Sequence, residues 1–122
     1  MTAAGPRVLV VDDDPLQVKL VERALSYDGF EVRGVTSIAE MVVEARRFAP
    51  RIVLMDVNMP DAPGDRAVAI ARDAAPGVRI VLYSSWEESR LRVLASQLGA
   101  NGFISKSDSV VAFGRQLRAL LA

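Results

Sequence analysis

The stretch VLVVDDDP, Val8 to Pro15, sets four apolar residues directly before three consecutive carboxylates and a proline. Unbroken runs of branched apolar residues are typical of strands that are buried on both faces of a parallel sheet. Carboxylates this close together repel one another and resist desolvation, so a buried strand that ends on them carries an electrostatic cost. The stretch therefore predicts a buried parallel strand whose carboxyl end has a use for concentrated negative charge.

Length and composition exclude most other kinds of chemistry. The chain has 122 residues with 15 basic and 15 acidic side chains, which suits one domain and gives no basic excess for binding nucleic acid. It has no cysteine and no histidine, which excludes disulfides, thiolate nucleophiles, Ser-His-Asp catalysis and the zinc sites built on these residues. The N-terminal segment lacks the apolar core of a signal peptide, and no apolar run is long enough to span a bilayer. We therefore expect a cytoplasmic protein without membrane contact, in which carboxylates, lysines and hydroxyls carry any chemistry.

Short apolar runs alternate with segments of helical period along the chain. The predicted strands are Arg7–Val11, Glu31–Val35, Ile52–Met55, Ile80–Tyr83 and Gly102–Ile104. The predicted helices cover about 16–25, 38–48, 65–74, 88–98 and 108–121. No Gly/Ser-rich linker interrupts the alternation, and no DNA-binding segment is recognised. The pattern predicts one α/β domain over residues 1–122, a doubly wound parallel sheet of five strands with five helices.

Single residues mark the ends of two helices. Asp14 stands directly before Pro15, and this order suits an N-cap followed by the first helical residue. Ser37 and Glu40 have the spacing of a capping box for the second helix, and Pro50 ends that helix. One cap needs only one side chain, so the acidic residues before Asp14 are left for another purpose.

Polar side chains stand at the carboxyl ends of four predicted strands. They are Asp12, Asp13, Asp14, Asp56, Ser84, Ser85 and Lys106. Because right-handed crossovers bring the carboxyl ends of parallel strands to one edge of the sheet, we expect these side chains to meet there. Mg²⁺ is usually held by one or two carboxylates, waters and a phosphoryl group. The sequence therefore predicts a magnesium site, in which the metal relieves the repulsion within the opening stretch.

In their order along the chain, these motifs resemble the receiver domains of two-component response regulators, and chemotaxis regulators in particular. The resemblance covers nearly the whole chain and rests on VLVVDDD, LMDVNMP, VLYSS, GANGF and GFISK. It implies a flavodoxin-like fold of the receiver type with strand order 2-1-3-4-5. It also implies a signalling protein that receives a phosphoryl group from a histidine kinase or phosphotransfer protein. Output would pass to a protein partner through the fourth helix, fifth strand and fifth helix, or to an output domain outside this chain.

The resemblance assigns the phosphoryl chemistry to five residues. Asp56 would accept the phosphoryl group, and Asp12 and Asp13 would hold magnesium together with Asp56 and the backbone carbonyl of Asn58. Lys106 would neutralise a phosphoryl oxygen. Phosphoryl transfer needs an in-line oxygen nucleophile and positive charge around the transferred oxygens, so a carboxylate beside magnesium and a lysine suits it.

The resemblance also implies a switch. Ser84 would be the switch hydroxyl, since its spacing to the lysine fits better than that of Ser85, and Phe103 would be the aromatic whose rotamer follows activation. Ser107 follows the lysine where a proline in a cis bond is frequent in the family. A cis bond before serine costs about 2.5–4 kcal/mol, so we expect a trans bond or a strained loop. Trp86 would either shield the phosphoryl group from water or belong to a partner surface.

Plainer interpretations and two other functions stay open at this point. Asp56 also suits the start of a turn, and Phe103 suits a core position. A magnesium-dependent phosphatase of the haloacid dehalogenase type uses similar groups. It places its nucleophile after the first strand, however, with a second Asp two residues later, where this chain has Asn58. The remaining alternative is a phosphorylation-independent interaction scaffold with a receiver fold.

Overall fold

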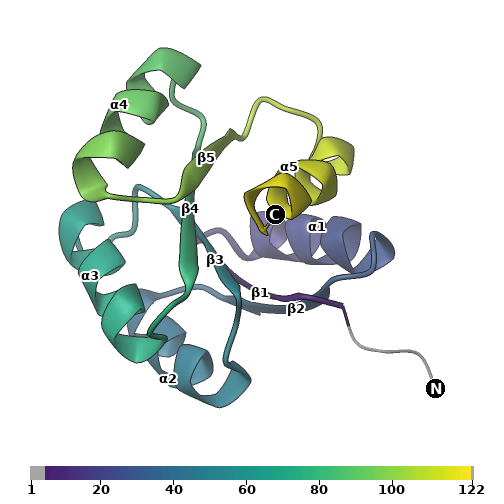
Figure 1. The fold of residues 1–122 in the computed structure, drawn as a ribbon, viewed down its shortest axis with the longest axis horizontal. Coiled ribbons are helices and arrows are strands. Elements are labelled where there is room, and N and C mark those ends of the chain that lie inside the picture. The colour runs from purple at the N-terminus through teal and green to yellow at the C-terminus, as the bar shows by residue number, and fades with distance from the viewer. Residues whose placement is uncertain (1–4, 122) are drawn as a thin grey trace.

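The computed structural model describes residues 5–121, which form a single sheet with helices on both faces (Figure 1). The strands are β1 (Arg7–Val11), β2 (Glu31–Val35), β3 (Ile52–Asp56), β4 (Arg79–Ser84) and β5 (Gly102–Ser105). The helices are α1 (Pro15–Tyr27), α2 (Ile38–Phe48), α3 (Gly64–Ala74), α4 (Glu88–Leu98) and α5 (Phe113–Leu121), with a 3-10 turn η1 (Val110–Ala112) before α5. All neighbouring strands are parallel, in the order β2-β1-β3-β4-β5. The predicted fold class and strand order are confirmed.

Three strands run one residue further at their carboxyl ends than the apolar runs predicted. The added residues are Asp56, Ser84 and Ser105. The ladder pairs Asp56 with Tyr83 and Ser84 with Ser105, so the sheet continues into the polar residues. The backbones of Asp56 and Ser84 are therefore held by the sheet and do not belong to free loops.

The predicted start of the last helix was wrong. The chain is not α-helical at residues 108–112, and α5 begins only at Phe113. The Ser109 hydroxyl accepts a hydrogen bond from the Val111 N–H at 3.3 Å and caps the 3-10 turn instead. Serine side chains compete in this way with helix formation. The loop between β5 and α5 is therefore longer than predicted, and Lys106 is its first residue.

The helix ends read from single residues are found where they were expected. The Asp14 side chain accepts from the Leu16 N–H, with Pro15 as the first residue of α1. The Ser37 side chain accepts from the Glu40 N–H at the start of α2. At the other end of α2, Ala49 adopts a left-handed backbone with φ 51° directly before the proline.

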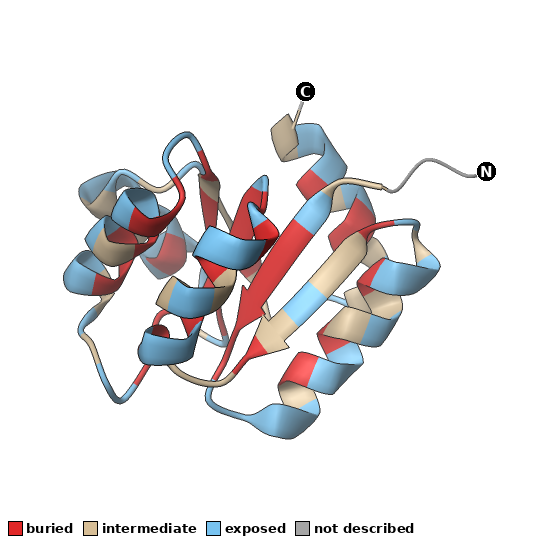
Figure 2. Cartoon of the chain, turned by 90° about the horizontal axis from the view of Figure 1, so that it is seen from below, coloured by how far each residue is buried: buried red, intermediate tan, exposed pale blue. Residues whose placement is uncertain are grey.

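Two separate hydrophobic cores lie on the two faces of the sheet. Helices α2, α3 and α4 cover one face, and α1 and α5 cover the other (Figure 1). Strand residues alternate between the cores: Leu9 and Val53 belong to the first, Val8 and Ile52 to the second. β1 is buried over four of its five residues, whereas the edge strand β2 is only half-buried (Figure 2). The opening stretch therefore does form a buried inner strand.

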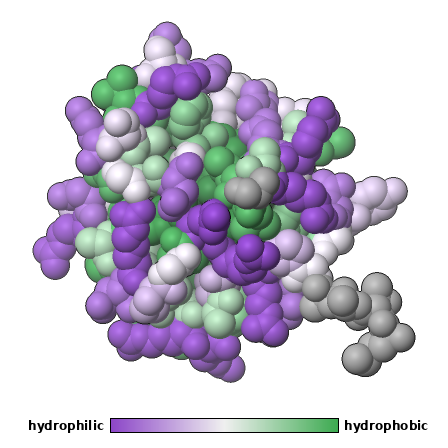
Figure 3. All heavy atoms as spheres, viewed as in Figure 1, coloured by the Kyte–Doolittle hydropathy of each residue, from purple (hydrophilic) through white to green (hydrophobic). Residues whose placement is uncertain are grey.

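Among the described residues, the charged side chains lie at the surface or half-buried, apart from the buried Asp12 and Asp56. On the face drawn in Figure 3, hydrophilic residues surround the molecule, and hydrophobic residues show between them as interrupted patches. Within residues 5–121, no helix has both the length and the apolar character needed to cross a membrane. Residues 1–4, which belong to the N-terminal segment for which no signal peptide is predicted, and residue 122 lie outside the described residues.

Candidate functional site

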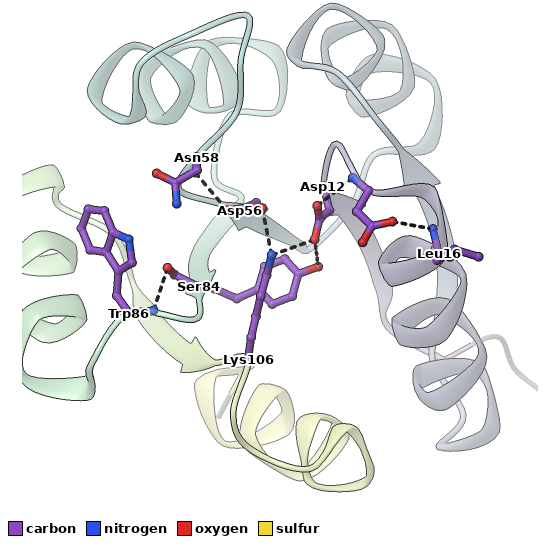
Figure 4. Close-up of polar contacts among 9 residues, drawn as sticks. Asp12, Leu16, Asp56, Asn58, Ser84, Trp86 and Lys106 are labelled. Atoms are coloured by element: carbon purple, nitrogen blue, oxygen red, sulfur yellow. Dashed lines mark hydrogen bonds and ion pairs between the residues drawn. The ribbon is translucent and has the colours of Figure 1, made fainter.

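Four elements bring polar side chains together at the carboxyl edge of the sheet (Figure 4). Asp12 follows β1, Asp56 ends β3, Ser84 ends β4 and Lys106 follows β5. The backbone N–H of Lys106 donates to the Ser84 carbonyl at 2.8 Å. This bond continues the pairing of β4 with β5 one residue beyond the end of β5. The predicted convergence of these side chains is observed.

Lys106 lies between two buried carboxylates. Its Nζ is 3.0 Å from Asp12 Oδ2 and 2.9 Å from Asp56 Oδ2. The Asp12 and Asp56 residues are only 1% and 6% exposed. Because an ammonium between two carboxylates offsets their repulsion, the lysine meets part of the electrostatic cost of the opening stretch.

The protonation states of this cluster depend on burial and on its hydrogen bonds. Burial alone would raise the pKa of Asp12, but hydrogen bonds from Tyr83, the Asp14 N–H and Lys106 together lower the pKa below its ordinary value. Burial alone would lower the pKa of Lys106, but hydrogen bonds to Asp56 and Asp12 and their charges raise it. Asp12 and Lys106 therefore stay ionised as a pair around neutral pH.

Three carboxylates form a group that fits a hard divalent cation. One carboxylate oxygen each from Asp12, Asp13 and Asp56 lies within 4.8 Å of the others. Asp13 is exposed, so the group opens to solvent on one side. An all-oxygen set of this kind, with room for water, suits Mg²⁺. The Asn58 N–H donates to Asp56 Oδ1 at 2.9 Å, which brings the loop after β3 beside the same carboxylate.

The hydroxyl of Ser84 is buried and bonded within its own loop. Its Oγ accepts a hydrogen bond from the Trp86 N–H at 3.1 Å (Figure 4). Ser85, the other candidate, is exposed. Accepting this bond leaves the hydroxyl hydrogen of Ser84 free to donate, and a turn of the side chain toward a group held at Asp56 would break the bond to Trp86.

The two candidate aromatics pack against the core that α2, α3 and α4 cover. The Arg92 guanidinium lies 5.2 Å from the ring centroid of Phe103, and the Arg90 guanidinium lies 3.9 Å from that of Trp86. In Figure 4 the Trp86 indole lies apart from Lys106. The indole is therefore half-buried beside α4 and does not cover the lysine.

The loop after β5 reaches its place without a cis bond. All peptide bonds in residues 5–121 are trans, as expected for the bond before Ser107. The Ser105 and Ser107 hydroxyls lie 2.6 Å apart, and the Ser107 N–H donates to Ser105 Oγ at 3.2 Å. The hydrogen bonds between Ser105 and Ser107 thus hold the backbone on both sides of Lys106 with trans peptide bonds.

Comparison with known proteins identifies the family. A family model for the response regulator receiver domain matches residues 8–112. This chain belongs to that family. The receiver is 31% identical to the chemotaxis protein CheY of Thermotoga maritima over 103 residues, which are 84% of this chain and 86% of that protein. It is also 31% identical to the probable transcriptional regulatory protein TcrX of Mycobacterium tuberculosis over 114 residues, 93% of this chain and 49% of that protein.

Solved receiver structures share the fold. The signal receiver domain of the putative response regulator NarL from Mycobacterium tuberculosis aligns with a TM-score of 0.82 at 28% identity, covering 98% of this chain and 99% of that one. CheY4 of Vibrio cholerae aligns with a TM-score of 0.85 at 23% identity, covering 96% of this chain and 99% of that one. The receiver spans about half the length of the first curated transcriptional regulators that it matches. The predicted family is confirmed.

Tyr83 was not predicted as a site residue, yet its side chain contacts both Asp12 and Lys106. Its hydroxyl donates a hydrogen bond to Asp12 Oδ2 at 2.5 Å, and its ring centroid lies 4.6 Å from Lys106 Nζ. Burial, followed by the hydrogen bond and charge of Asp12, raises the pKa of Tyr83 far above its usual value, so the phenol remains a donor. The available signal was a tyrosine in an otherwise apolar strand, because a buried hydroxyl needs a partner.

Asp61 in the loop after β3 was also missed. Its carboxylate accepts hydrogen bonds from the Ile38 N–H at 2.9 Å and from the Ala39 N–H at 3.3 Å. These N–H groups belong to the first turn of α2, where Ser37 caps a third one. Asp61 therefore attaches the loop that follows Asp56 to the N-terminus of α2.

Proposed function

We propose that this receiver is a cytoplasmic phosphoacceptor, with residues 1–122 as one receiver domain. A histidine kinase or phosphotransfer protein would donate a phosphoryl group to Asp56 in a Mg²⁺-dependent reaction. The observation that carries the proposal is the setting of Asp56, whose Oδ2 meets the Lys106 ammonium at 2.9 Å within the acidic group of Asp12 and Asp13. A buried carboxylate beside a cation and a cation site suits the acceptance of a phosphoryl group.

Each side chain has a defined task in that transfer. A carboxylate oxygen of Asp56 attacks the phosphorus, the bond from phosphorus to the donor breaks, and an acyl phosphate forms on Asp56. The Lys106 ammonium leaves its carboxylate partners and binds an oxygen of the transferred group. Asp12, Asp13, Asp56 and the backbone carbonyl of Asn58 would hold Mg²⁺, which neutralises charge on the phosphoryl oxygens. Water later hydrolyses the acyl phosphate, so the protein turns over only its own modification and acts as a signalling acceptor.

The acyl phosphate would be read by the switch residues. Ser84 Oγ leaves the Trp86 N–H, to which it is bonded at 3.1 Å, and donates to a phosphoryl oxygen. Phe103 follows into the space beside β4 and changes the surface formed by α4, β5 and α5. A protein partner or an attached output domain would bind that surface, with no nucleic-acid contact by this domain.

Phosphodonor labelling tests the acceptor. We expect Mg²⁺ and acetyl phosphate to add one phosphoryl group to the wild type and none to Asp56→Asn, measured by intact mass. Asp73→Asn is the matched control, because Asp73 is an exposed aspartate outside the cluster, and it should be labelled like the wild type. Full labelling of Asp56→Asn rejects Asp56 as the acceptor. An unlabelled wild type favours the phosphorylation-independent scaffold.

A further inference from the structure

Tyr83 connects three strands at the centre of the receiver. It lies in β4 in register with Asp56 of β3, and its hydroxyl reaches beyond β3 to the Asp12 carboxylate that follows β1. The side chain is fully buried in the core under α1 and α5, where its ring meets Phe113 edge-on with centroids 6.4 Å apart. The ring packs in this core, but packing alone does not account for a buried hydroxyl, which needs a hydrogen-bond partner.

The hydroxyl completes a set of donors around Asp12. Asp12 Oδ1 accepts from the Asp14 N–H at 3.0 Å, and Oδ2 accepts from Tyr83 and from the Lys106 ammonium at 3.0 Å. Donors on both oxygens fix the plane of the carboxylate. If Lys106 turns to another partner, the Tyr83 hydroxyl is the donor that stays on Oδ2, and a buried carboxylate oxygen without any donor is costly.

We propose that Tyr83 is a positioning residue of this site. Its hydroxyl holds the Asp12 carboxylate in the orientation that a divalent cation requires, and it keeps Asp12 satisfied when Lys106 leaves for a phosphoryl oxygen. The inference rests on the proposed function for the movement of Lys106. The hydroxyl acts through Asp12 and touches neither the metal nor the phosphoryl group.

Removal of the Tyr83 hydroxyl has an expected effect on metal affinity. Groups that hydrogen-bond to a metal ligand orient it and tune its basicity, and their loss typically weakens metal affinity by about 10–100-fold. The ring has a separate effect, because its face lies 4.6 Å from the Lys106 ammonium and attracts it. Tyr83→Phe keeps the ring and its contact with Phe113 and removes only the hydroxyl, so it separates the two effects.

Magnesium titration tests the proposal. We expect the Mg²⁺ dissociation constant of Tyr83→Phe, measured by calorimetry, to rise by about 10-fold or more over that of the wild type. Tyr27→Phe is the matched control, because Tyr27 is the other tyrosine of the chain and is 92% exposed. At saturating Mg²⁺, acetyl phosphate should still label Tyr83→Phe more slowly than the wild type. Without the Tyr83 hydroxyl, Lys106 is the donor that remains for Asp12 Oδ2, so it is less free to bind a phosphoryl oxygen.

A second measurement observes Tyr83 without replacing it by another residue. In protein labelled with 3-fluorotyrosine, the ¹⁹F signal of Tyr83 should move during a Mg²⁺ titration and that of Tyr27 should stay, with Tyr27→Phe assigning the two signals. A Tyr83→Phe protein that binds Mg²⁺ as tightly as the wild type overturns the inference, as does a Tyr83 signal indifferent to Mg²⁺. Both outcomes leave the proposed function intact if the wild type binds Mg²⁺ and is labelled. A wild type that binds no Mg²⁺ overturns the proposed function and this inference together.

Discussion

At the scale of single residues, the site sets one ammonium against two buried carboxylates. Asp12 and Asp56 are both buried, and the Lys106 ammonium lies within 3.0 Å of each. The Lys106 side chain is 22% exposed, so it can move toward solvent while the two carboxylates stay in place. In the proposed reaction, the lysine would exchange its carboxylate partners for a phosphoryl oxygen, and Mg²⁺ held at Asp12, Asp13 and Asp56 would supply positive charge at the carboxylates.

The lowered pKa of Asp12 gives a testable pH dependence. A carboxyl group with a lower pKa in the folded state contributes stability above its unfolded pKa of about 3.9, and loses it as pH falls through the folded pKa. Without Mg²⁺, the wild type should therefore lose more free energy of unfolding between pH 7 and pH 3 than Asp12→Asn does. Urea unfolding at both pH values measures the difference.

Asp73→Asn controls for the general effect of removing one carboxylate, since Asp73 lies exposed on α3. The raised pKa of Lys106 acts at the opposite end of the pH scale. Its contribution is complete below the unfolded pKa and is lost as pH rises through the folded one, so it does not disturb the comparison. Equal losses for the wild type and Asp12→Asn between pH 7 and pH 3 would contradict the assigned role of the Asp12 carboxylate.

The sequence could predict site residues that are polar and stand at strand ends. Asp12, Asp56 and Lys106 were found this way, because parallel strands bring their carboxyl ends to one edge. Tyr83 could not be found this way, because its role depends on a reach from β4 past β3 to Asp12. Asp61 escaped for a similar reason, since its partners are backbone N–H groups 22 and 23 residues earlier in the chain.

At the scale of elements, the interiors were predictable and several ends were not. Apolar runs and helical periods reflect burial, and burial decides the middle of each element. The ends are decided by hydrogen bonds: the ladder extends β3 to Asp56 and β4 to Ser84, and Ser109 delays α5 until Phe113. These are the ends at which the site residues lie, so sequence analysis is least accurate at the edge that carries function.

The N-terminus of α2 offers a test at this scale. Asp61 bonds to two N–H groups of its first turn and Ser37 to a third. Removing a side-chain cap costs about 0.5–2 kcal/mol, so we expect Asp61→Ala and Ser37→Ala each to lower the free energy of unfolding by that amount. Asp61→Asn should lose less, because an amide oxygen still accepts a hydrogen bond. Denaturant unfolding measures all three, and an Asp61→Ala protein as stable as the wild type would contradict this role.

At the scale of the whole molecule, the site and the proposed partner surface are joined through two loops. The loop after β4 holds Ser84 and Trp86, and the loop after β5 holds Lys106, whose N–H donates to the Ser84 carbonyl at 2.8 Å. The sheet beneath is closely packed between two cores. We therefore expect a change at Asp56 to move the loops and the start of α4 more than the strands.

Trp86 allows this movement to be observed, since it is the only tryptophan. Its backbone N–H is bonded to Ser84 Oγ and its ring is stacked on Arg90. If Ser84 turns to the phosphoryl group, this bond breaks and the indole changes its environment, so tryptophan emission should shift when the wild type is phosphorylated. Asp56→Asn should show no shift, because it takes no label.

Ser84→Ala separates the switch from the labelling. This variant should still accept the phosphoryl group on Asp56, measured by intact mass, yet show a much smaller emission shift, because no hydroxyl links Trp86 to the site. Since the indole lies apart from Lys106, Trp86→Phe should hydrolyse its acyl phosphate as fast as the wild type. A full emission shift in labelled Ser84→Ala would mean that another contact moves the loop after β4. Faster hydrolysis in Trp86→Phe would mean that the indole closes over the acyl phosphate after phosphorylation.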